Sequence, residues 1–341
     1  MKQYILRGLI VALIIAAFLI FSHRNTRGQY IKIAGFVQGT TYHITYQSPA
    51  GKNLQLEIDS LLADFDRSLS IYLPTSIISR INQNDPAVEA DDKIIEVFQK
   101  SLELYRKTGG AFDITVAPLV NAWGFGFKAA SATDSATIDS LMQYVGMDKV
   151  KLSGKRIIKA HPNVMLDVNA IAQGYSVDII SEYLHKLKIK NYMVEIGGEV
   201  RTRGRNEKGS IWRIGIDKPL EGNVIPGSNL QAILQLDRRS LATSGNYRKF
   251  YEKDGIKYSH TINPATGYPA MSDLLSATII ADDCMTADAY ATACMVFGLE
   301  KSIRFLDQNK FLDAYLIYND EKGQYRVYYS KGLSRYLAEP L

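Results

Sequence analysis

The sequence predicts an α+β fold, with one large domain of antiparallel strands and grouped helices. Predicted strands come in runs and predicted helices lie together, which argues against a doubly wound parallel sheet. The chain has 341 residues, 46% of them hydrophobic, so it can bury a large core. It has no G-x-G-x-x-G turn after a strand and no G-x-x-x-x-G-K-[ST] loop, so neither familiar phosphate-binding loop is present.

The N-terminus carries an apolar run that predicts a membrane anchor. Residues 8–21 are uncharged, and Lys2 and Arg7 precede them. The run has the length of a signal-peptide core, is shorter than the roughly 20 residues of an ordinary spanning helix, and lacks a small-x-small cleavage site after it. We expect residues 1–29 to form an uncleaved signal anchor and short linker, and residues 30–341 to lie outside the cytoplasm. Cleavage after the run is the alternative.

Hydrophobic periodicity predicts the elements of the first half of the chain. Residues 35–47 alternate like a strand, and residues 54–70 carry apolar side chains at helical spacing. Residues 91–110 show the same helical spacing and end on two glycines, a helix stop signal. A further helix is expected over residues 170–187.

The second half is predicted to be richer in strands. Short strands are expected at 191–204, 212–217, 230–237, 240–252 and 256–262. A strand at 275–281 leads into helices at 285–298 and 300–308, and strands at 313–319 and 325–329 close the domain.

Charge and cysteine content exclude some classes of partner. The formal charge of +5 is modest, and the short basic clusters at 201–205 and 238–239 lack regular aromatic interleaving, so nucleic-acid binding is disfavoured. The two cysteines, Cys284 and Cys294, make neither a tetrahedral zinc site nor a disulfide framework. We expect both to be small buried apolar residues.

The stretch 109–126, "GGAFDITVAPLVNAWGFG", surrounds Asp113 with aromatic residues. Such a density of rings is typical of core, and a platform for a stacked planar ligand is the alternative. In the stretch 166–178, "LDVNAIAQGYSVD", Asp167 precedes a predicted helix. Asp167 is expected either to cap that helix or to accept hydrogen bonds from a ligand.

Asp288 and Thr292 are spaced i and i+4 in "CMTADAYATACMVFG", so on a helix both oxygens project from one face. Carboxylate and hydroxyl are hard oxygen ligands that suit magnesium better than zinc. The alternative is that Asp288 solvates a helix end while Thr292 bonds a helix carbonyl. A weaker signal is "ATSGNY", residues 242–247, where Thr243, Ser244 and Gly245 could turn backbone amides onto a phosphate.

His260 lies in "KYSHTINPATGYP", where a predicted strand from Gly255 to Ile262 runs into a tight loop punctuated by prolines. A strand end that feeds a constrained loop can hold a side chain in a fixed direction. The histidine could alternatively serve only to hydrogen-bond its own loop.

Six stretches together resemble one known family. "GGAFDITVAPLVNAWGFG", "LDVNAIAQGYSVD", "VEIGGEV", "ATSGNYR", "YSHTINPATGYP" and "MTADAYATA" stand in the order and spacing of the FAD:protein FMN transferases, the ApbE family. The resemblance spans roughly residues 35–329 and implies a T-fold-like catalytic domain at 30–341. It also implies that FMN passes from FAD to a serine or threonine of a target protein, with magnesium as cofactor and AMP released. Some members instead hydrolyse FAD.

The resemblance also implies site residues, matched motif by motif. His260 corresponds to the active-site histidine, and the Ala170 carbonyl, Asp288 and Thr292 correspond to magnesium ligands. The implied FAD contacts are Gln38, Tyr72, Ala111, Phe112, Asp113, Asp167, Gln173 and, through its backbone, Ile262. Gln173 stands where the family often has lysine, and Gln38 replaces a frequent methionine, so these two contacts depart from the family pattern.

The chemistry agrees with those roles. A pyrophosphate repels an oxygen nucleophile, so magnesium would neutralise phosphate charge while an imidazole takes the hydroxyl proton. Whether His260 acts as base or as transient nucleophile stays open here. FAD hydrolysis is the alternative activity, and a non-catalytic flavin-binding protein is a further one.

The acceptor implied by the resemblance carries an acidic-x-x-Ser/Thr-Gly-Ala-Thr-type motif and is expected to be a membrane redox subunit. That motif is not intact in this chain, because the similar "DLLSAT" at 273–278 lacks the glycine. The expected location is the inner membrane, with the catalytic domain facing the periplasm.

Overall fold

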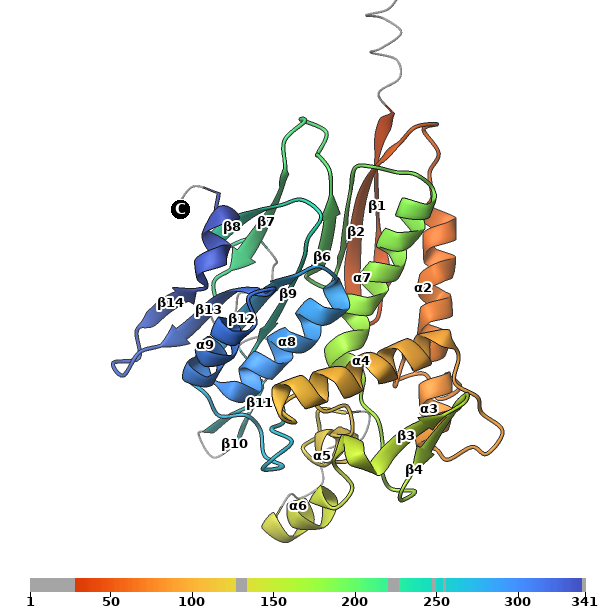
Figure 1. The fold of residues 1–341 in the computed structure, drawn as a ribbon, viewed down its shortest axis with the longest axis vertical. Helices are drawn as coiled ribbons and strands as arrows, with labels where there is room; N and C mark the ends of the chain where they lie inside the picture. The colour runs from red at the N-terminus through yellow and green to blue at the C-terminus, as the bar shows by residue number, and fades with distance from the viewer. Residues whose placement is uncertain (1–27, 127–133, 220–226, 247–249, 254–255, 339–341) are drawn as a thin grey trace, which may run out of the picture.

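The computed structural model describes residues 28–126, 134–219, 227–246, 250–253 and 256–338, and the statements below concern these residues. An eight-stranded sheet runs through the molecule in the order β1-β2-β5-β6-β9-β12-β13-β14 (Figure 1). Every neighbouring pair of strands in it is antiparallel. The predicted α+β class is therefore confirmed.

Most sheet strands lie close to the predicted ranges. The strands of the sheet are β1 (Gln29–Val37), β2 (Thr40–Ser48), β5 (Tyr192–Ile196), β6 (Glu199–Arg203), β9 (Ser240–Gly245), β12 (Leu274–Ala281), β13 (Asp313–Asn319) and β14 (Tyr325–Tyr329). The single strand expected over 35–47 is wrong. Gln38 and Gly39 both have positive φ (54° and 73°) and form a two-residue turn, so this stretch is the closed end of a hairpin.

The single strand expected at 191–204 is wrong too, because Gly197 and Gly198, with φ 63° and 108°, divide it into two antiparallel strands. The sheet strand expected at 240–252 ends at Gly245.

Helices cover one face of the sheet. They are α2 (Gln55–Leu69), α7 (Asn169–Lys186), α8 (Cys284–Phe297) and α9 (Leu299–Gln308), and α4 (Asp92–Thr108) packs across α7 and α8 (Figure 1). All five were expected, α2 and α4 from their helical periodicity. The ends of α4 follow local signals, because the Asp91 side chain accepts from Ile94 N at 2.9 Å and Gly109 ends the helix with φ 60°.

The hairpin of β7 (Trp212–Asp217) and β8 (Leu230–Leu236) covers the other face of the sheet, with the 3₁₀ helix η2 (Lys331–Arg335). Successive side chains of a strand point to opposite faces, so neighbours on one strand join different clusters. On β9, Ala242 packs with α7 and α8, whereas Leu241 packs with β7, β8 and Leu333.

Several short elements were missed by the sequence analysis. They are α3 (Ile77–Asn82), α5 (Ala117–Ala122), α6 (Ser135–Met142), η1 (Met147–Lys149) and the hairpin of β3 (Val150–Ser153) and β4 (Arg156–Lys159). Each spans about two turns of helix or four residues of strand, too short to establish a period. A further hairpin pairs β10 (Phe250–Lys253) with β11 (Ile256–Ser259).

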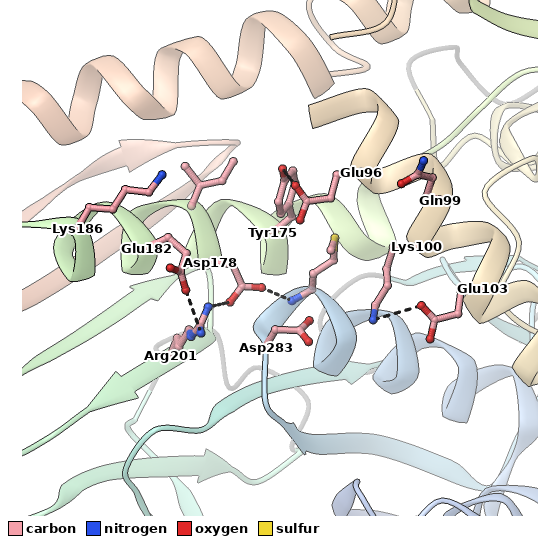
Figure 2. Close-up of a pocket in the computed structure, with 12 residues that line it drawn as sticks. Glu96, Gln99, Lys100, Glu103, Tyr175, Asp178, Glu182, Lys186, Arg201 and Asp283 are labelled. Carbon is pink, nitrogen blue, oxygen red and sulfur yellow. Dashed lines mark hydrogen bonds and ion pairs between the residues drawn. The ribbon is translucent and has the colours of Figure 1, made fainter. Parts of the chain in front are cut away.

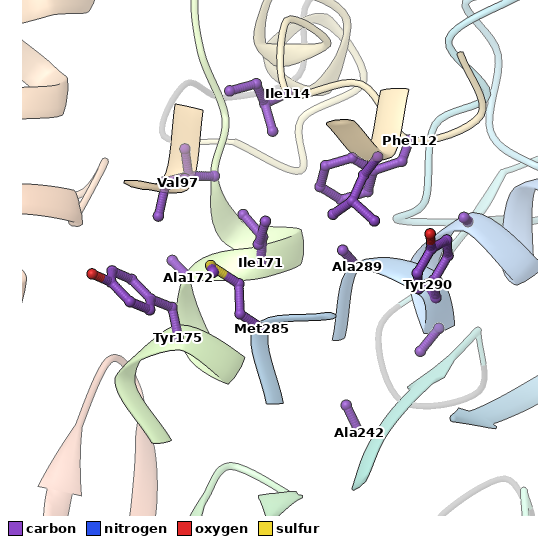
Figure 3. Close-up of a cluster of buried hydrophobic side chains, with 14 of the residues drawn as sticks. Val97, Phe112, Ile114, Ile171, Ala172, Tyr175, Ala242, Met285, Ala289 and Tyr290 are labelled. Carbon is purple, nitrogen blue, oxygen red and sulfur yellow. The ribbon is translucent and has the colours of Figure 1, made fainter. Parts of the chain in front are cut away.

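A hydrophobic cluster beneath α4 joins α7, α8 and the segment that contains Phe112. Phe112, only 2% exposed, lies with Ile171 of α7 and with Met285 and Ala289 of α8 (Figure 3). Cys284 and Cys294 are free and buried, as predicted, and burial raises the pKa of both thiols.

The predicted N-terminal anchor lies outside the described residues. Within the part of the chain that the structure describes, no helix combines the length and the apolar character needed to cross a membrane.

Candidate active site

The helices α7 and α8 cross closely at Gly174. A Cβ atom at this position would lie 2.4 Å from the carbonyl oxygen of Cys284 and 2.8 Å from Cβ of Asp288. Only glycine permits this approach, because non-bonded contacts below 3.0 Å do not occur at real Cβ atoms. The crossing brings the Gly174 amide to Asp288, whose Oδ2 accepts its hydrogen bond at 3.0 Å.

Asp288 is buried at this crossing, with 6% of its surface exposed, so it does not solvate a helix end. Burial raises the pKa of Asp288 to about 7, and the charge of Asp178 acts in the same direction. Among the described residues no cationic side chain lowers it. Burial of a carboxylate without a positive partner reduces the free energy of unfolding, and binding of a cation lessens this loss.

The carbonyl of Ala170 lies beside this carboxylate. Ala170 is the second residue of α7, and in an α-helix the carbonyl of residue i receives the amide of residue i+4, here Gly174. Asp288 Oδ2 lies 3.0 Å from the same amide. Helix geometry therefore directs the Ala170 carbonyl, a second predicted metal ligand, toward the same amide that Asp288 bonds.

Thr292 lies one turn beyond Asp288 on α8, as predicted. Its Oγ1 is 3.1 Å from Oγ of Ser244 on β9, which replaces the expected bond to a helix carbonyl. The expected phosphate-binding turn at 243–245 is wrong, because Thr243, Ser244 and Gly245 continue β9 and pair with β12. Their backbone runs extended along β12 on one side, whereas β6 pairs with β9 only at Ser240 and Leu241 on the other.

The donor set at the crossing fits magnesium. Within the described residues no group of three or more His, Cys, Asp or Glu side chains could hold a metal ion. A metal here would therefore draw on mixed oxygens, namely one carboxylate, one hydroxyl and one backbone carbonyl, and magnesium accepts such a set with water completing its shell.

His260 follows directly after β11, which ends at Ser259 and is shorter than the expected strand. The loop after it is held by the amide of Gly267, which donates to Asn263 O at 2.9 Å. Trp123 Nε1 donates to Gly267 O at 2.8 Å, and the His260 ring lies edge-on to Phe125, with centroids 6.5 Å apart. The stretches 109–126 and 257–269, distant in sequence, thus lie together.

The aromatic residues near Asp113 are chiefly core. The Phe112 ring is enclosed between α7 and α8, so any ligand contact of Ala111 and Phe112 would use their backbone. Asp113 accepts hydrogen bonds from Thr115 N at 2.7 Å and Thr115 Oγ1 at 2.6 Å. Burial raises the pKa of Asp113 to about 6.

Asp167 and Tyr72 meet at the start of α7. Asp167 Oδ1 accepts from the backbone N of Asn169, the first residue of α7, at 2.9 Å, but the N-cap position is Val168, so Asp167 is not the cap residue. Burial raises the pKa of Asp167 to about 6. Asn169 Nδ2 donates to Tyr72 Oη at 3.3 Å. Tyr72 is 60% exposed, which leaves its ring available to a ligand.

The two residues that depart from the family pattern both lie at α7: Gln173 is part of this helix, and Gln38 is bonded to it. Gln173 Nε2 donates to Ile196 O at 3.0 Å and also to the carboxylate of Glu199. Gln38, in the β1–β2 turn, accepts from Ser176 Oγ at 3.4 Å. Ile262 is 5% exposed and packs in the core with α5, so only its backbone can face a ligand.

The sequence analysis did not single out Glu199 or Asp178. Burial is the main cause that raises the pKa of the Glu199 carboxyl, and the charge of Asp288 adds to it. Asp178 is buried between α7 and α8 and is bonded to Arg201. The available signal was an acidic residue within each of two motif stretches, "VEIGGEV" for Glu199 and "AQGYSVD" for Asp178.

A separate groove of about 740 Å³ lies between α4, α7 and the start of α8 (Figure 2). Its lining includes Glu96, Tyr175, Glu182 and Arg201. None of the predicted site residues lines it. The groove is therefore distinct from the candidate site.

Comparison with known proteins confirms the resemblance. The chain matches the profile of the ApbE family over residues 38–316. It is 34% identical to an FAD:protein FMN transferase of Vibrio cholerae, over 98% of this chain and 100% of the relative. A protein of the same description from Haemophilus influenzae is 34% identical, over 92% of this chain and 93% of the relative.

Solved structures agree. The flavin transferase ApbE from Vibrio cholerae superposes with a TM-score of 0.81 at 34% identity, covering 91% of this chain and 99% of that one. The apo flavinyl transferase ApbE from Pseudomonas stutzeri superposes with a TM-score of 0.82 at 31% identity, covering 92% and 99%. With the family profile matched over most of its length and relatives above 30% identity along nearly all of it, the chain belongs to the ApbE family and is a transferase.

Proposed function

We propose that this protein is a magnesium-dependent FAD:protein FMN transferase, which attaches the FMN part of FAD to a serine or threonine hydroxyl and releases AMP. The observation that supports this most is the buried carboxylate of Asp288, which has no cationic partner among the described residues and is bonded to the Gly174 amide of α7. A divalent cation is the partner that such a carboxylate lacks, and a pyrophosphate substrate requires one.

The metal would be held by Asp288, by Thr292 Oγ1 and by the Ala170 carbonyl. When bound, magnesium supplies positive charge to the pyrophosphate oxygens and to the leaving AMP. The contact of Thr292 with Ser244 orients the hydroxyl on the same face of α8 as Asp288. Gly174 fixes the distance between the two helices that carry the ligands.

His260 would accept the proton of the attacking hydroxyl. Its position after β11 and beside the Phe125 ring holds the imidazole on a loop that Trp123 fastens to α5. A base of this kind contributes about 10²–10⁴-fold to the rate. In this role the proton moves to a ring nitrogen as the hydroxyl oxygen forms its bond to phosphorus.

The flavin nucleotide would be held at the start of α7. Tyr72 offers an exposed ring, Asp167 and Asp113 offer carboxyl oxygens, and Ala111 and Phe112 offer backbone groups. Gln38, Gln173 and the backbone of Ile262 would complete the contacts. Gln173 already bonds Glu199 and Ile196, so its part would be to orient neighbours at the site.

The acceptor would be a membrane redox subunit with an acidic-x-x-Ser/Thr-Gly-Ala-Thr-type motif, facing the compartment that holds the catalytic domain. Residues 1–29 would anchor the protein in the inner membrane, with residues 30–341 on the periplasmic side. Support for this topology is the apolar run at 8–21 preceded by Lys2 and Arg7.

The test uses the full chain in detergent with FAD, magnesium and an acceptor domain that carries the motif. Transfer predicts that the acceptor gains the mass of FMN less water and that one AMP appears per modified residue. Replacement of the acceptor hydroxyl residue by alanine should abolish the adduct. Free FMN formed at equal rates with and without acceptor would instead show hydrolysis, and release of neither product would show a flavin-binding protein.

A further inference from the structure

The carboxylate of Asp178, on α7, is bound to the first turn of α8. Cys284 N lies 2.9 Å from each of its oxygens, and Met285 N donates to Oδ2 at 2.8 Å. Arg201 Nη1, from β6, donates to Oδ1 at 2.8 Å. Asp178 is 7% exposed, so these bonds are largely shielded from water although Asp178 lies at the wall of the groove.

Local capping of α8 does not explain Asp178. The first turn of a helix has amides without intrahelical partners, and a residue just before the helix normally serves them. Asp283 does so here, because its Oδ1 accepts from Thr286 N at 2.7 Å and its carbonyl accepts from Ala287 N. Asp178 takes the two amides that Asp283 leaves, and it does so from another helix.

The contacts of Asp178 and Gly174 form a pair. Asp178 lies one turn after Gly174 on α7, and Cys284 lies one turn before Asp288 on α8. Gly174 holds Asp288, and Asp178 holds the start of the same helix. Two contacts separated by a turn on each helix oppose both sliding and rotation of α8 along α7.

Arg201 balances the charge of Asp178 at this joint. Its guanidinium also lies 3.3 Å from Glu182 Oε1, at the wall of the groove between α4 and α7 (Figure 2). Arg201 comes from β6, so the joint connects α7, α8 and the central sheet. A charge-assisted, nearly buried bond of this kind is stronger than a surface ion pair.

We propose that Asp178, supported by Arg201, is a positioning residue of the metal site. It fixes the register of α8 on α7 and thereby the separation of Asp288 and Thr292 from the Ala170 carbonyl. Asp178 does not touch the metal or the substrate in this role. This role rests on the proposed metal site, and the experiment below distinguishes a failure of the metal site from a failure of the role of Asp178.

The test measures Mn²⁺ binding to the full-length protein in detergent from the electron paramagnetic resonance signal of free Mn²⁺. Asp178→Asn keeps the size of the side chain and removes its charge and one acceptor. We expect its Mn²⁺ affinity to fall about 10-fold or more, in the range found when groups that orient metal ligands are removed. FAD binding without metal, followed by flavin fluorescence, should change less than about 2-fold, because the flavin contacts lie elsewhere.

Tyr175→Phe is the matched control. Tyr175 is on α7 too, and its hydroxyl donates to Glu96 Oε2 at 2.6 Å, which joins α7 to α4 and not to α8. This variant loses a partly buried interhelical bond, and we expect its Mn²⁺ affinity to equal that of the wild type. An equal loss in both variants would show that general loosening of α7 causes the effect and would overturn the inference.

Kinetics give a second readout. Because Asp178 acts through the metal, AMP release by Asp178→Asn should need about 10-fold more magnesium for half-maximal rate and approach the wild-type rate at saturation. Arg201→Gln, which keeps Asp178, should raise the magnesium requirement by a smaller factor. This variant replaces Asp178→Asn in the test if Asp178→Asn does not fold.

The role of Asp178 would be overturned if folded Asp178→Asn bound Mn²⁺ with wild-type affinity. If only Arg201→Gln folds, wild-type affinity in that variant would have the same meaning. Either result would leave the metal site standing. Absence of Mn²⁺ binding to the wild type would overturn the metal site and this inference with it.

Discussion

Replacement of Gly174 by alanine tests the crossing on which the site depends. The new Cβ would lie 2.4 Å from Cys284 O, and contacts under 3.0 Å do not occur, so the helices must separate there by about 0.6 Å (3.0 minus 2.4). Metal–ligand distances tolerate only about 0.2 Å. A shift of about 0.6 Å between α7 and α8 therefore exceeds what one metal ion can bridge between Ala170 and Asp288.

The effect on stability should be smaller than the effect on the metal. Alanine favours a helix interior by about 1 kcal/mol over glycine, whereas overpacking costs about 1–3 kcal/mol. We expect a net loss of unfolding free energy of about 1 kcal/mol and, for a protein of this size, a fall in Tm of about 1–2 °C. Magnesium affinity, in contrast, should fall at least about 10-fold.

The assay combines thermal unfolding in chelator, Mn²⁺ binding and magnesium-dependent AMP release. Ser181→Ala is a suitable control, because Ser181 is buried on the same helix and its hydroxyl has no partner among the described residues. That change adds helix propensity without a clash and should leave metal affinity unchanged. If Gly174→Ala binds Mn²⁺ as tightly as the wild type, the close crossing does not set the metal geometry.

Three further outcomes are expected. The pKa of Asp288 is raised to about 7 from an ordinary 3.8, so between these pH values the metal-free folded state binds more protons than the unfolded state. Tm measured in chelator should therefore fall as pH rises from about 4 to about 7. The fall should be smaller in Asp288→Asn, and an equal fall in both would assign it to other carboxyls. His260→Ala should still bind FAD but release AMP about 10²–10⁴-fold more slowly, measured by chromatography, and a near-normal rate would exclude the proposed base. A reporter enzyme that is active only in the cytoplasm, fused after Leu341, should be silent in whole cells, and activity would reverse the proposed topology.

The position of the Asp288 side chain follows from local sequence spacing, whereas that of the Phe112 ring does not. The spacing of Asp288 and Thr292 placed both on one helix face, because i and i+4 positions coincide on any α-helix. Phe112 stands in an equally prominent motif, but its ring is enclosed by α7 and α8, segments tens of residues or more away in the chain. No local spacing indicates such an enclosure.

Thr243 and Ser244 illustrate the same limit for backbone groups. Threonine, serine and glycine in succession are typical of a turn, and that reading predicted amides directed at a phosphate. The pairing of β9 with β12 overrides this local preference, because it holds these residues in an extended strand instead of a turn. The identity of a residue is therefore a weaker guide to its backbone conformation than the presence of a neighbouring strand.

The sequence by itself determined the helices with long amphipathic periods, such as α2 and α4, the glycine stop of α4, and most of the strands. These depend on interactions within a few residues, which the chain order specifies directly. The order of the eight strands, the crossing at Gly174 and the reach of Asp178 to amides 106 residues away were decided only by the tertiary structure. Such contacts form when distant segments pack to bury apolar surface, and their free energy depends on shape and distance in space, which no short pattern of residues records.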